Sequence, residues 1–406
     1  MVNQSLSFSK SIQTPIREVY RAFTNATYLR EWLCDIATVA PRENGRLYLA
    51  WNSGYYVSGE YISLDPDKKV LFNWLGKNEP FATQVSVSLT AKGEKTLIEL
   101  LHSGLGSGTD WEKISKEIKH GWESGLENLV SVLETGEDLR ITQRPMLGIM
   151  VGEFNEEVAK EIGVPSSKGI RIDGVLDEMG AKAAGLDKDD VMVEVAGMNV
   201  EDWASLAGAL EKFKAGDQVE VAFYRGGVKK STSMTLSKRP LPEIPATQYE
   251  LADLVSKENA NIQDKLDRLL ANLGESEASY KPDPKEWNIK ENIAHLIQGE
   301  RYTQMWIEQL LGNQEHFSDD WEGNQHPAVA ATAAAYPSLA DIREEYRRSM
   351  AETVALLNHL PDQFVAKKGR FWRISTNLLE GTSHFDSHFE QMSKLIEESR
   401  QKESLG

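Results

Sequence analysis

The stretches EWNIKENIAHLIQGE, residues 286–300, and HFDSHFEQM, residues 384–392, decide the fold of the last third of the chain. Their apolar side chains recur every three or four residues, which predicts helices. His295 lies in the first predicted helix, and His384 and His388 lie in the second. Residues four apart share one face of a helix, and a neighbouring helix can supply the third imidazole. We therefore expect a divalent-metal site made by His295, His384 and His388.

Two readings of these histidines remain open. Histidine pairs four residues apart are frequent in helices, so the spacing alone also fits coincidence. If the histidines do bind a metal, three protein ligands with an open position for water are typical of catalytic zinc. Neutral imidazole also suits nickel, iron and copper. The sequence shows no general base or nucleophile, so metal binding by itself does not establish catalysis.

The region around these histidines, residues 247–402, has helical periodicity almost throughout. Four long helices are predicted, over residues 250–273, 288–311, 338–360 and 383–399. Asn288 with Glu291 has the pattern of a capping box at the start of the second helix. Helices of this length predict a four-helix bundle. The alanine-rich stretch PAVAATAAAYP, residues 327–337, is expected to be a crossover, a lid or a plain loop.

This region resembles the DinB-like family, also called the DinB/YfiT superfamily of metalloenzymes, through its Trp and His-Leu in one helix and its His-x-x-x-His in the last. The resemblance implies that His295, His384 and His388 bind a divalent metal, commonly zinc or nickel. In the family, such a metal activates a low-molecular-weight thiol or water. Glu300 and Gln391 are candidates for hydrogen bonds that orient the ligand imidazoles. Homodimerisation is a further implication of the resemblance.

Residues 1–138 have a different pattern, in which apolar side chains alternate with period two. After a first strand and a helix near Pro15, strands are predicted for the runs GRLYLAW, YYVSGEYISL, KKVLFNWLG, FATQVSVSLTAKG and KTLIELLHSG. A long helix comes next, with one apolar stripe formed by Ile114, Ile118, Trp122, Leu126, Leu129 and Leu133. We expect an antiparallel sheet closed over this helix.

The phrases TPIREVYRAFTNATYLREWL, GEYISLDPDKKVLFNW and HGWESGLENLVSVLETGEDLR in this segment resemble the activator of heat-shock ATPase homologue family of the START-like, or SRPBCC, superfamily. The resemblance implies a helix-grip fold with an apolar cavity that binds a small apolar ligand. Trp32, Trp51, Trp74 and Trp122 are the candidate cavity residues. Large aromatic side chains are mostly buried whatever the function, so these four also fit plain core positions.

Residues 143–238 read as short strands and helices with glycines at the turns. The run GIRIDGVLDEMGAKAAGLDKDD, residues 169–190, and the residues after it resemble a bacterial-type PDZ domain. The resemblance implies that backbone N–H groups of Met146, Leu147, Gly148 and Ile149 bind the carboxylate of a peptide C-terminus, and that the peptide adds as a strand beside a helix starting at Trp203. A role as spacer or in interdomain docking stays open, because a fold does not establish a function.

A proline-punctuated linker, residues 239–246, separates this domain from the helical region. The predicted fold class is therefore multidomain α+β, with a helix-grip START-like domain, a β-rich PDZ-like domain and an all-α bundle. Each of the three segments has its own hydrophobic pattern, so we expect three domains.

The composition of the whole chain limits its partners. The 406 residues carry a formal net charge of −17, which repels phosphate backbones and anionic membranes, so we expect neither nucleic acid nor membrane as a partner. The single cysteine, Cys34, excludes an intramolecular disulfide and a Cys-x-x-Cys motif. The first residues lack the apolar run of a signal peptide, and no stretch approaches the roughly 18 apolar residues of a membrane span. We expect a cytoplasmic protein.

Two functions are consistent with these expectations. The first is a metal-dependent enzyme, a thiol transferase or hydrolase acting on a small compound, with His295, His384 and His388 as ligands. The alternative is a non-catalytic adaptor or stress-related protein of co-chaperone type. In that case the first domain holds an apolar ligand, the PDZ-like groove holds a peptide end, and the metal only stabilises the bundle.

Overall fold

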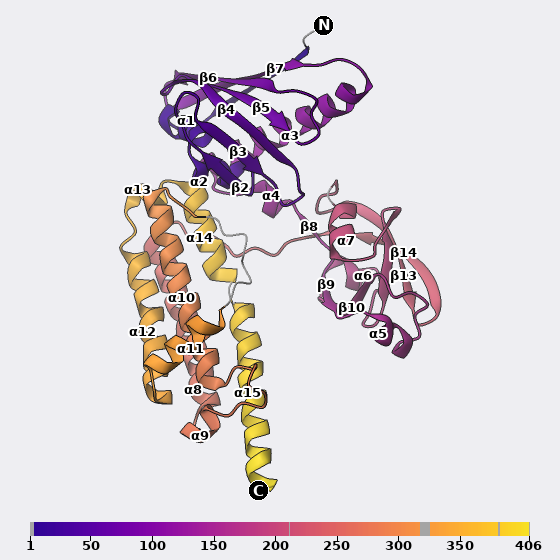
Figure 1. Cartoon of the computed structure of the whole chain (residues 1–406), viewed down its shortest axis with the longest axis vertical. Helices are drawn as coiled ribbons and strands as arrows, with labels where there is room; N and C mark the ends of the chain where they lie inside the picture. The colour runs from indigo at the N-terminus through magenta and orange to yellow at the C-terminus, as the bar shows by residue number, and fades with distance from the viewer. Residues whose placement is uncertain (1–3, 211, 317–324, 381, 406) are drawn as a thin grey trace. The chain divides into compact units, whose positions relative to one another are not determined.

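The computed structural model describes residues 4–210, 212–316, 325–380 and 382–405, with the side chains of residues 382–384 and 403–405 left out. Its elements form two compact units (Figure 1). One unit combines Met1–Asp138 with Pro242–Gly406, and the other is Leu139–Leu241. None of the described helices is both long and apolar enough to cross a bilayer.

A seven-stranded antiparallel sheet forms the first part of the larger unit, with strand order β1-β7-β6-β5-β4-β3-β2. The strands are β1 (Gln4–Ile12), β2 (Ile36–Val39), β3 (Arg46–Ala50), β4 (Tyr56–Asp65), β5 (Lys69–Gly76), β6 (Thr83–Lys92) and β7 (Lys95–Leu105). Three helices accompany them, α1 (Ile16–Thr24), α2 (Ala26–Trp32) and α3 (Thr109–Glu134). The sheet-plus-long-helix architecture predicted from the alternating strands is confirmed.

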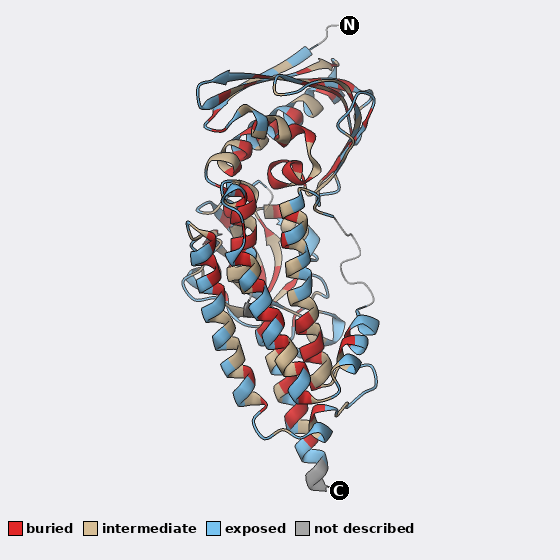
Figure 2. Ribbon diagram, turned by 90° about the vertical axis from the view of Figure 1, so that its left-hand side faces the viewer, coloured by how far each residue is buried: buried red, intermediate tan, exposed pale blue. Residues whose placement is uncertain are grey.

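Helix α3 buries the stripe that its sequence predicts. Ile118, Trp122, Leu126 and Leu129 are buried, and they join the inward-facing strand residues in one core. In Figure 2 the buried residues alternate along the strands, as expected for a sheet with one covered face. The inner face of this sheet is therefore the side that is buried in the core, and the other face is exposed and carries both polar side chains and apolar ones such as Leu101.

The second part of the larger unit is helical. Its elements are α8 (Gln248–Leu269), α9 (Glu275–Ala278), α10 (Ile289–Gly312), α11 (His326–Ala335), α12 (Leu339–Asn358), α13 (Asp362–Val365), α14 (Lys368–Glu380) and α15 (Thr382–Leu405). The capping box of Asn288 and Glu291 is present at the start of α10. The four predicted long helices correspond to α8, α10, α12 and α15. The structure adds α14, and it makes the alanine-rich stretch a helix, α11, rather than a plain loop.

Helix α14 joins the two parts of the larger unit through buried charges. The Nε of Arg370 donates to Oε1 of Glu31 in α2 over 2.7 Å, and their side chains are 0% and 5% exposed. Nη1 of Arg370 also donates to the carbonyl of Leu310 near the end of α10. Nearby, Glu315 pairs with both Arg30 and Arg373. The side chains of these five residues are at most 21% exposed, so the attraction between their charges is only weakly screened by water and salt.

The smaller unit is β-rich. Its larger sheet has the order β14-β13-β11-β10-β9, with β12 also paired to β11, and β15 pairs separately with β8. The elements are α4 (Leu139–Thr142), β8 (Pro145–Met146), β9 (Ile149–Gly152), α5 (Glu156–Glu161), β10 (Ile170–Val175), α6 (Gly180–Ala183), β11 (Val191–Val195), β12 (Met198–Asn199), α7 (Trp203–Leu210), β13 (Gln218–Arg225), β14 (Val228–Thr235) and β15 (Ser237–Lys238). The predicted β-rich domain with a helix starting at Trp203 is confirmed.

Candidate functional site

Helices α10 and α15 carry the histidines singled out in the sequence. The side chain of Asn288 accepts a hydrogen bond from the Glu291 backbone N–H, which fixes where α10 begins. In α15, Phe385 and Met392 are buried in the same apolar cluster as Ile293 of α10. This packing holds the face of α15 that carries His388 against the bundle core.

The rings of His295 and His388 lie next to each other. Their centres are 4.8 Å apart and their planes are inclined by 56°. The two residues are 93 positions apart in the sequence, so only the packing of α10 against α15 brings them together. The side chain of the third predicted ligand, His384, lies outside the described part of the structure.

The tautomer of His388 is set by its neighbours. Its Nδ1 is 2.9 Å from Oδ1 of Asn292 and 3.1 Å from Oε1 of Gln391. The orientation of the Asn292 amide is fixed, because its Nδ2 donates to the Asn288 carbonyl over 3.0 Å. An amide oxygen can only accept, so Nδ1 of His388 carries the hydrogen and Nε2 carries the lone pair. Nε2 is then the nitrogen that a metal ion would take.

The two candidates for orienting groups lie in different surroundings. Gln391 contacts His388, as described. Glu300 instead accepts a hydrogen bond from Oγ1 of Thr353 in α12 over 2.6 Å. Burial raises the pKa of the Glu300 carboxyl. Asn292 is an orienting residue that the sequence prediction missed, although its position one helical turn before His295 was a usable signal.

A tryptophan and a further histidine adjoin the pair. The indole centre of Trp287 is 4.8 Å from the ring centre of His295 and 6.2 Å from that of His388. Its Nε1 donates to Nδ1 of His326 over 3.1 Å. The sequence prediction left His326 out. Across the described side chains, which do not include that of His384, no group of three or more His, Cys, Asp or Glu is placed to hold a metal ion.

In the smaller unit, the predicted carboxylate loop connects β8 to β9. The backbone of Gly148 has φ +81°, a conformation that residues with a Cβ rarely adopt. A Cβ placed there would also lie 2.2 Å from the Cβ of Met179. Glycine is therefore required at this position by the fold itself. The carbonyls of Leu147 and Gly148 accept from the backbone N–H groups of Ala181 and Leu176, which fixes the loop against α6 and the turn before it.

Strand β9 is an edge strand of the larger sheet in this unit. Met150 and Val151 in β9 are 50% and 48% exposed, and Trp203 at the start of α7 is 59% exposed. An edge strand offers unpaired backbone N–H and C=O groups to an added strand. Met150 and Val151 would lie beside a strand added at this edge.

The four predicted cavity tryptophans lie in the core of the first domain. Trp32, Trp74 and Trp122 are buried and Trp51 packs against them as a partly buried residue. The indole N–H of Trp32 donates to the Ala22 carbonyl, and that of Trp51 donates to the Leu33 carbonyl. The indole N–H of Trp74 donates to Oε1 of Glu79, and that of Trp122 donates to Nδ1 of His102. Each indole is therefore held in place by the protein itself.

His102 is fully buried beside these tryptophans. Its Nδ1 accepts from Nε1 of Trp122 over 3.0 Å, and its Nε2 is 2.7 Å from Oγ1 of Thr83. An indole only donates, so Nε2 of His102 must carry the hydrogen and donate it to Thr83. Burial lowers the pKa of His102 to about 4. His102 is thus a neutral structural histidine.

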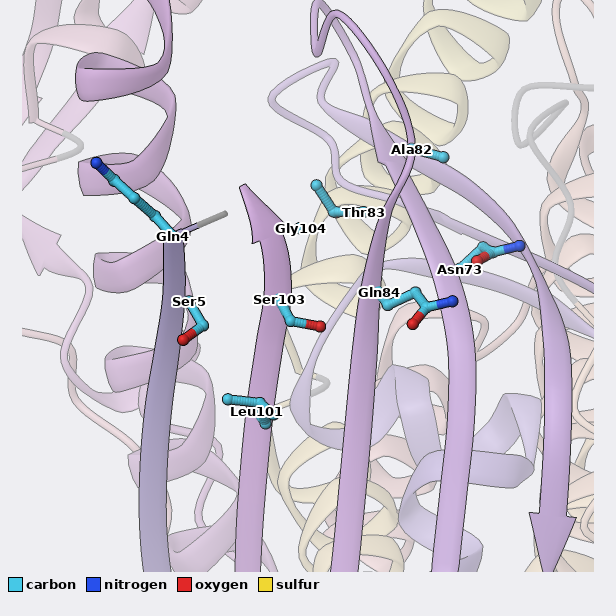
Figure 3. A pocket seen from close by; sticks show the side chains of 9 residues that line it. All are labelled: Gln4, Ser5, Asn73, Ala82, Thr83, Gln84, Leu101, Ser103 and Gly104. Atoms are coloured by element: carbon cyan, nitrogen blue, oxygen red, sulfur yellow. The ribbon is translucent and has the colours of Figure 1, made fainter. Parts of the chain in front are cut away.

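An open hollow of about 430 Å³ lies on the sheet of the first domain (Figure 3). The residues that line it are Gln4, Ser5, Asn73, Ala82, Thr83, Gln84, Leu101, Ser103 and Gly104. Gln84 and Ser103 alternate with the buried Val85 and His102, so this hollow opens on the sheet face opposite the core. None of the four tryptophans lines it.

The structure thus contains a sheet with a long helix, a β-rich domain with an exposed edge strand, and a helical bundle. Three family models match in the same order. They are "Activator of Hsp90 ATPase homolog 1-like protein" over residues 13–134, "PDZ domain" over residues 145–236, and "DinB superfamily" over residues 260–392. The chain therefore contains an Hsp90-activator-like domain, a PDZ domain and a DinB domain, in this order.

Two curated relatives match a limited part of the chain. A probable periplasmic serine endoprotease of DegP-like type from Marinomonas sp. is 32% identical over 97 residues, 24% of this chain and 21% of that protein. A probable periplasmic serine protease of do/HhoA-like type from Haemophilus influenzae is 29% identical over 110 residues, 27% of this chain and 23% of that protein. The chain spans less than a quarter of the length of either relative.

Solved structures resemble the chain over about a third of its length. The Aha1 dimer from Colwellia psychrerythraea is 23% identical, with 34% of this chain and 99% of that chain covered and a TM-score of 0.30. An HSP90 activator from Plasmodium falciparum is 23% identical, with 32% and 95% covered and a TM-score of 0.29. These likenesses concern fold alone.

Proposed function

We propose that the DinB domain holds a divalent metal, zinc or nickel, through His295, His384 and His388, and that the protein is a metal-dependent enzyme acting on a small compound. The observation that carries this proposal is the pairing of His295 and His388, with ring centres 4.8 Å apart on two different helices. Imidazole nitrogen suits both metals. Asn292 supports the proposal because it holds His388 in the tautomer that offers Nε2.

The donor set fits catalytic rather than structural chemistry. A metal with three protein ligands keeps an open position, where it lowers the pKa of a bound water or thiol. This chemistry suits a thiol transferase or a hydrolase, with a low-molecular-weight thiol as cosubstrate of the former. The protein's own contribution is orientation. The amides of Asn292 and Gln391 keep the proton of His388 on Nδ1, and the indole of Trp287 covers one side of the ring pair.

Metal analysis of the purified full chain tests the proposal. We expect about one zinc or nickel ion per chain in the wild type, as for a single three-histidine site. His388→Ala should lose most of this metal. His359→Ala is the matched control, because His359 is exposed at the end of α12 and its Nδ1 contacts only the local Ala355 carbonyl among the described residues. Equal metal content in the two variants would contradict the proposal.

An activity screen separates the enzyme from the alternative of a structural metal. The screen uses small electrophilic and ester substrates, with and without small thiols, and compares the wild type with His388→Ala. A turnover that disappears in His388→Ala while the bundle stays folded supports an enzyme. If the variant only melts at a lower temperature and the wild type turns over nothing, the metal is structural.

A second function is favoured by the exposed edge of the PDZ domain. We propose that β9 and α7 bind a peptide C-terminus, with the backbone N–H groups of residues 146–149 receiving the carboxylate. The exposed Met150 and Val151 on the edge strand support this. A labelled peptide library with free C-termini should bind, and the same peptides with amidated ends should bind at least about 10-fold more weakly, since the charge-assisted hydrogen bonds are lost.

The remaining expectations are also proposals. The Hsp90-activator-like domain is a candidate binder of a small apolar ligand, with Trp32, Trp51, Trp74 and Trp122 as the candidate cavity residues. The DinB domain is a candidate homodimer interface, and sedimentation of the full chain tests this. We propose a cytoplasmic location, which fits the single buried thiol of Cys34. Fractionation of expressing cells against periplasmic and cytoplasmic markers decides it.

A further inference from the structure

Trp287 connects the candidate metal ligands to a histidine outside the motif. Its indole plane lies 26° from the plane of His388, with ring centres 6.2 Å apart, and 36° from the plane of His295, with ring centres 4.8 Å apart. The edge of the same indole points at His326, with Nε1 3.1 Å from Nδ1 and the ring planes at 62°. One side chain therefore contacts three imidazoles.

His326 has a defined place because α11 is packed on α10. His326 is the first residue of α11 and is followed by Pro327, whose fixed φ favours the start of a helix. Further along α11, Val329 is buried in the bundle core, and Oγ1 of Thr332 accepts from Nε2 of Gln298 in α10. The position of His326 is thus set by tertiary packing as well as by its own turn.

We propose that His326 is a positioning residue that acts through Trp287 to fix the orientation of His295 and His388. The inference rests on the proposed function, since ring orientation matters most if the rings bind a metal. A tryptophan side chain has two rotatable bonds. Stacking on the imidazoles restricts its tilt, and the N–H···N bond to His326 restricts its rotation. Groups that orient metal ligands typically change metal affinity by about 10- to 100-fold when they are removed.

The hydrogen bond also excludes His326 as a fourth ligand in this arrangement. The indole N–H can only donate, so Nδ1 of His326 accepts and the ring hydrogen lies on Nε2. A neutral imidazole in this tautomer has its single lone pair on Nδ1, which Trp287 already occupies. Among the described side chains, it is the indole of Trp287 that connects His326 to the two imidazoles.

The experiment compares His326→Ala with His326→Gln in the full chain. Glutamine offers a side-chain oxygen that can accept from the indole N–H, and alanine offers none. Zinc affinity is measured by competition with a chromophoric chelator, and the absorption spectrum of the cobalt(II)-loaded protein reports ligand geometry. We expect zinc affinity to fall about 10- to 100-fold in His326→Ala and to recover to within about threefold of the wild type in His326→Gln.

Trp287→Phe provides a second, independent variant, because phenylalanine keeps an aromatic face but removes the N–H. It should weaken zinc binding about as much as His326→Ala, and His326→Ala should add nothing in the Trp287→Phe background. His359→Ala should leave the affinity and the cobalt spectrum unchanged. The cobalt spectrum should shift in His326→Ala and return in His326→Gln, a pattern that a general loss of stability does not produce.

The failures of the two proposals are distinguishable. A wild type that binds no zinc overturns the proposed function, and this inference with it. A wild type that binds zinc while His326→Ala binds it equally well overturns only the positioning role. Equal losses in His326→Ala and His326→Gln also overturn it, because the accepting atom then has no part in the effect.

Discussion

At the scale of single residues, His102 makes stability depend on pH. Its pKa is about 4 in the folded protein, against an ordinary value of 6.5. Between these values the unfolded chain binds a proton that the folded chain does not, so stability falls as pH falls from 6.5 towards 4. For this one group, the unfolding free energy should drop by about 2 kcal/mol between pH 7.5 and pH 5.

Chemical denaturation of wild type and His102→Gln at the two pH values measures this effect. The variant should be less stable at pH 7.5, because it disturbs the contacts with Trp122 and Thr83, but it should lose less stability on going to pH 5. His120→Gln, on the exposed side of α3, should keep the wild-type pH dependence. If His102→Gln loses as much stability between pH 7.5 and pH 5 as the wild type does, the buried neutral imidazole is not responsible.

Gly148 offers a matched comparison with Gly163. Both have positive φ, +81° and +74°, but only at Gly148 would a Cβ meet another atom closely, the Cβ of Met179 at 2.2 Å. Gly163→Ala should cost about 1 kcal/mol from the backbone conformation alone. Gly148→Ala should cost clearly more, since the backbone around Met179 must also move. Hydrogen exchange of residues 139–241 in the full chain measures both, and equal losses would show that the contact is unimportant.

At the scale of elements, local signals predicted the helices whose apolar faces meet one core. The capping box at Asn288 and the apolar spacing of α10 and α15 were readable from the sequence. Helix α14 was missed because it buries the charged Arg370, whereas charged side chains are expected on the exposed face of a helix. Helix α11 was missed because its alanine-rich sequence has no apolar stripe that distinguishes one face from the other.

The candidate metal site, too, could be predicted from the sequence only in part. The spacing of His384 and His388 and the resemblance of the two helices singled out the site from sequence. Asn292 was within reach, since it lies one turn before His295. The contact of Trp287 with His326 joins residues 39 positions apart through the packing of α11, and no local pattern encodes that distance. The limits of the three domains, 1–138, 143–238 and 247–402, and the linker 239–246 stay predictions.

At the scale of the whole molecule, one compact unit combines the two ends of the sequence. Met1–Asp138 and Pro242–Gly406 share the buried pair of Glu31 and Arg370. Arg370 also holds the carbonyl of Leu310 near the end of α10, the helix that carries His295. The Hsp90-activator-like domain is thus linked through Arg370 of α14 to one of the two helices that supply the described imidazoles. We expect these two domains to unfold as a single cooperative transition.

Substitutions at the buried pair test this coupling. Arg370→Met leaves the Glu31 carboxylate buried without its partner, and Glu31→Leu does the same to the guanidinium, so each should cost about 3–5 kcal/mol of unfolding free energy. The double variant Glu31→Leu with Arg370→Met removes both charges and should be clearly more stable than the sum of the single losses. Arg347→Ala, which breaks an exposed pair within α12, is the control and should change little.

Guanidinium denaturation, followed separately by tryptophan fluorescence and helical circular dichroism, measures the unfolding free energy of all four variants. Strictly additive losses, or two separate transitions already in the wild type, would contradict a single unit joined by this pair.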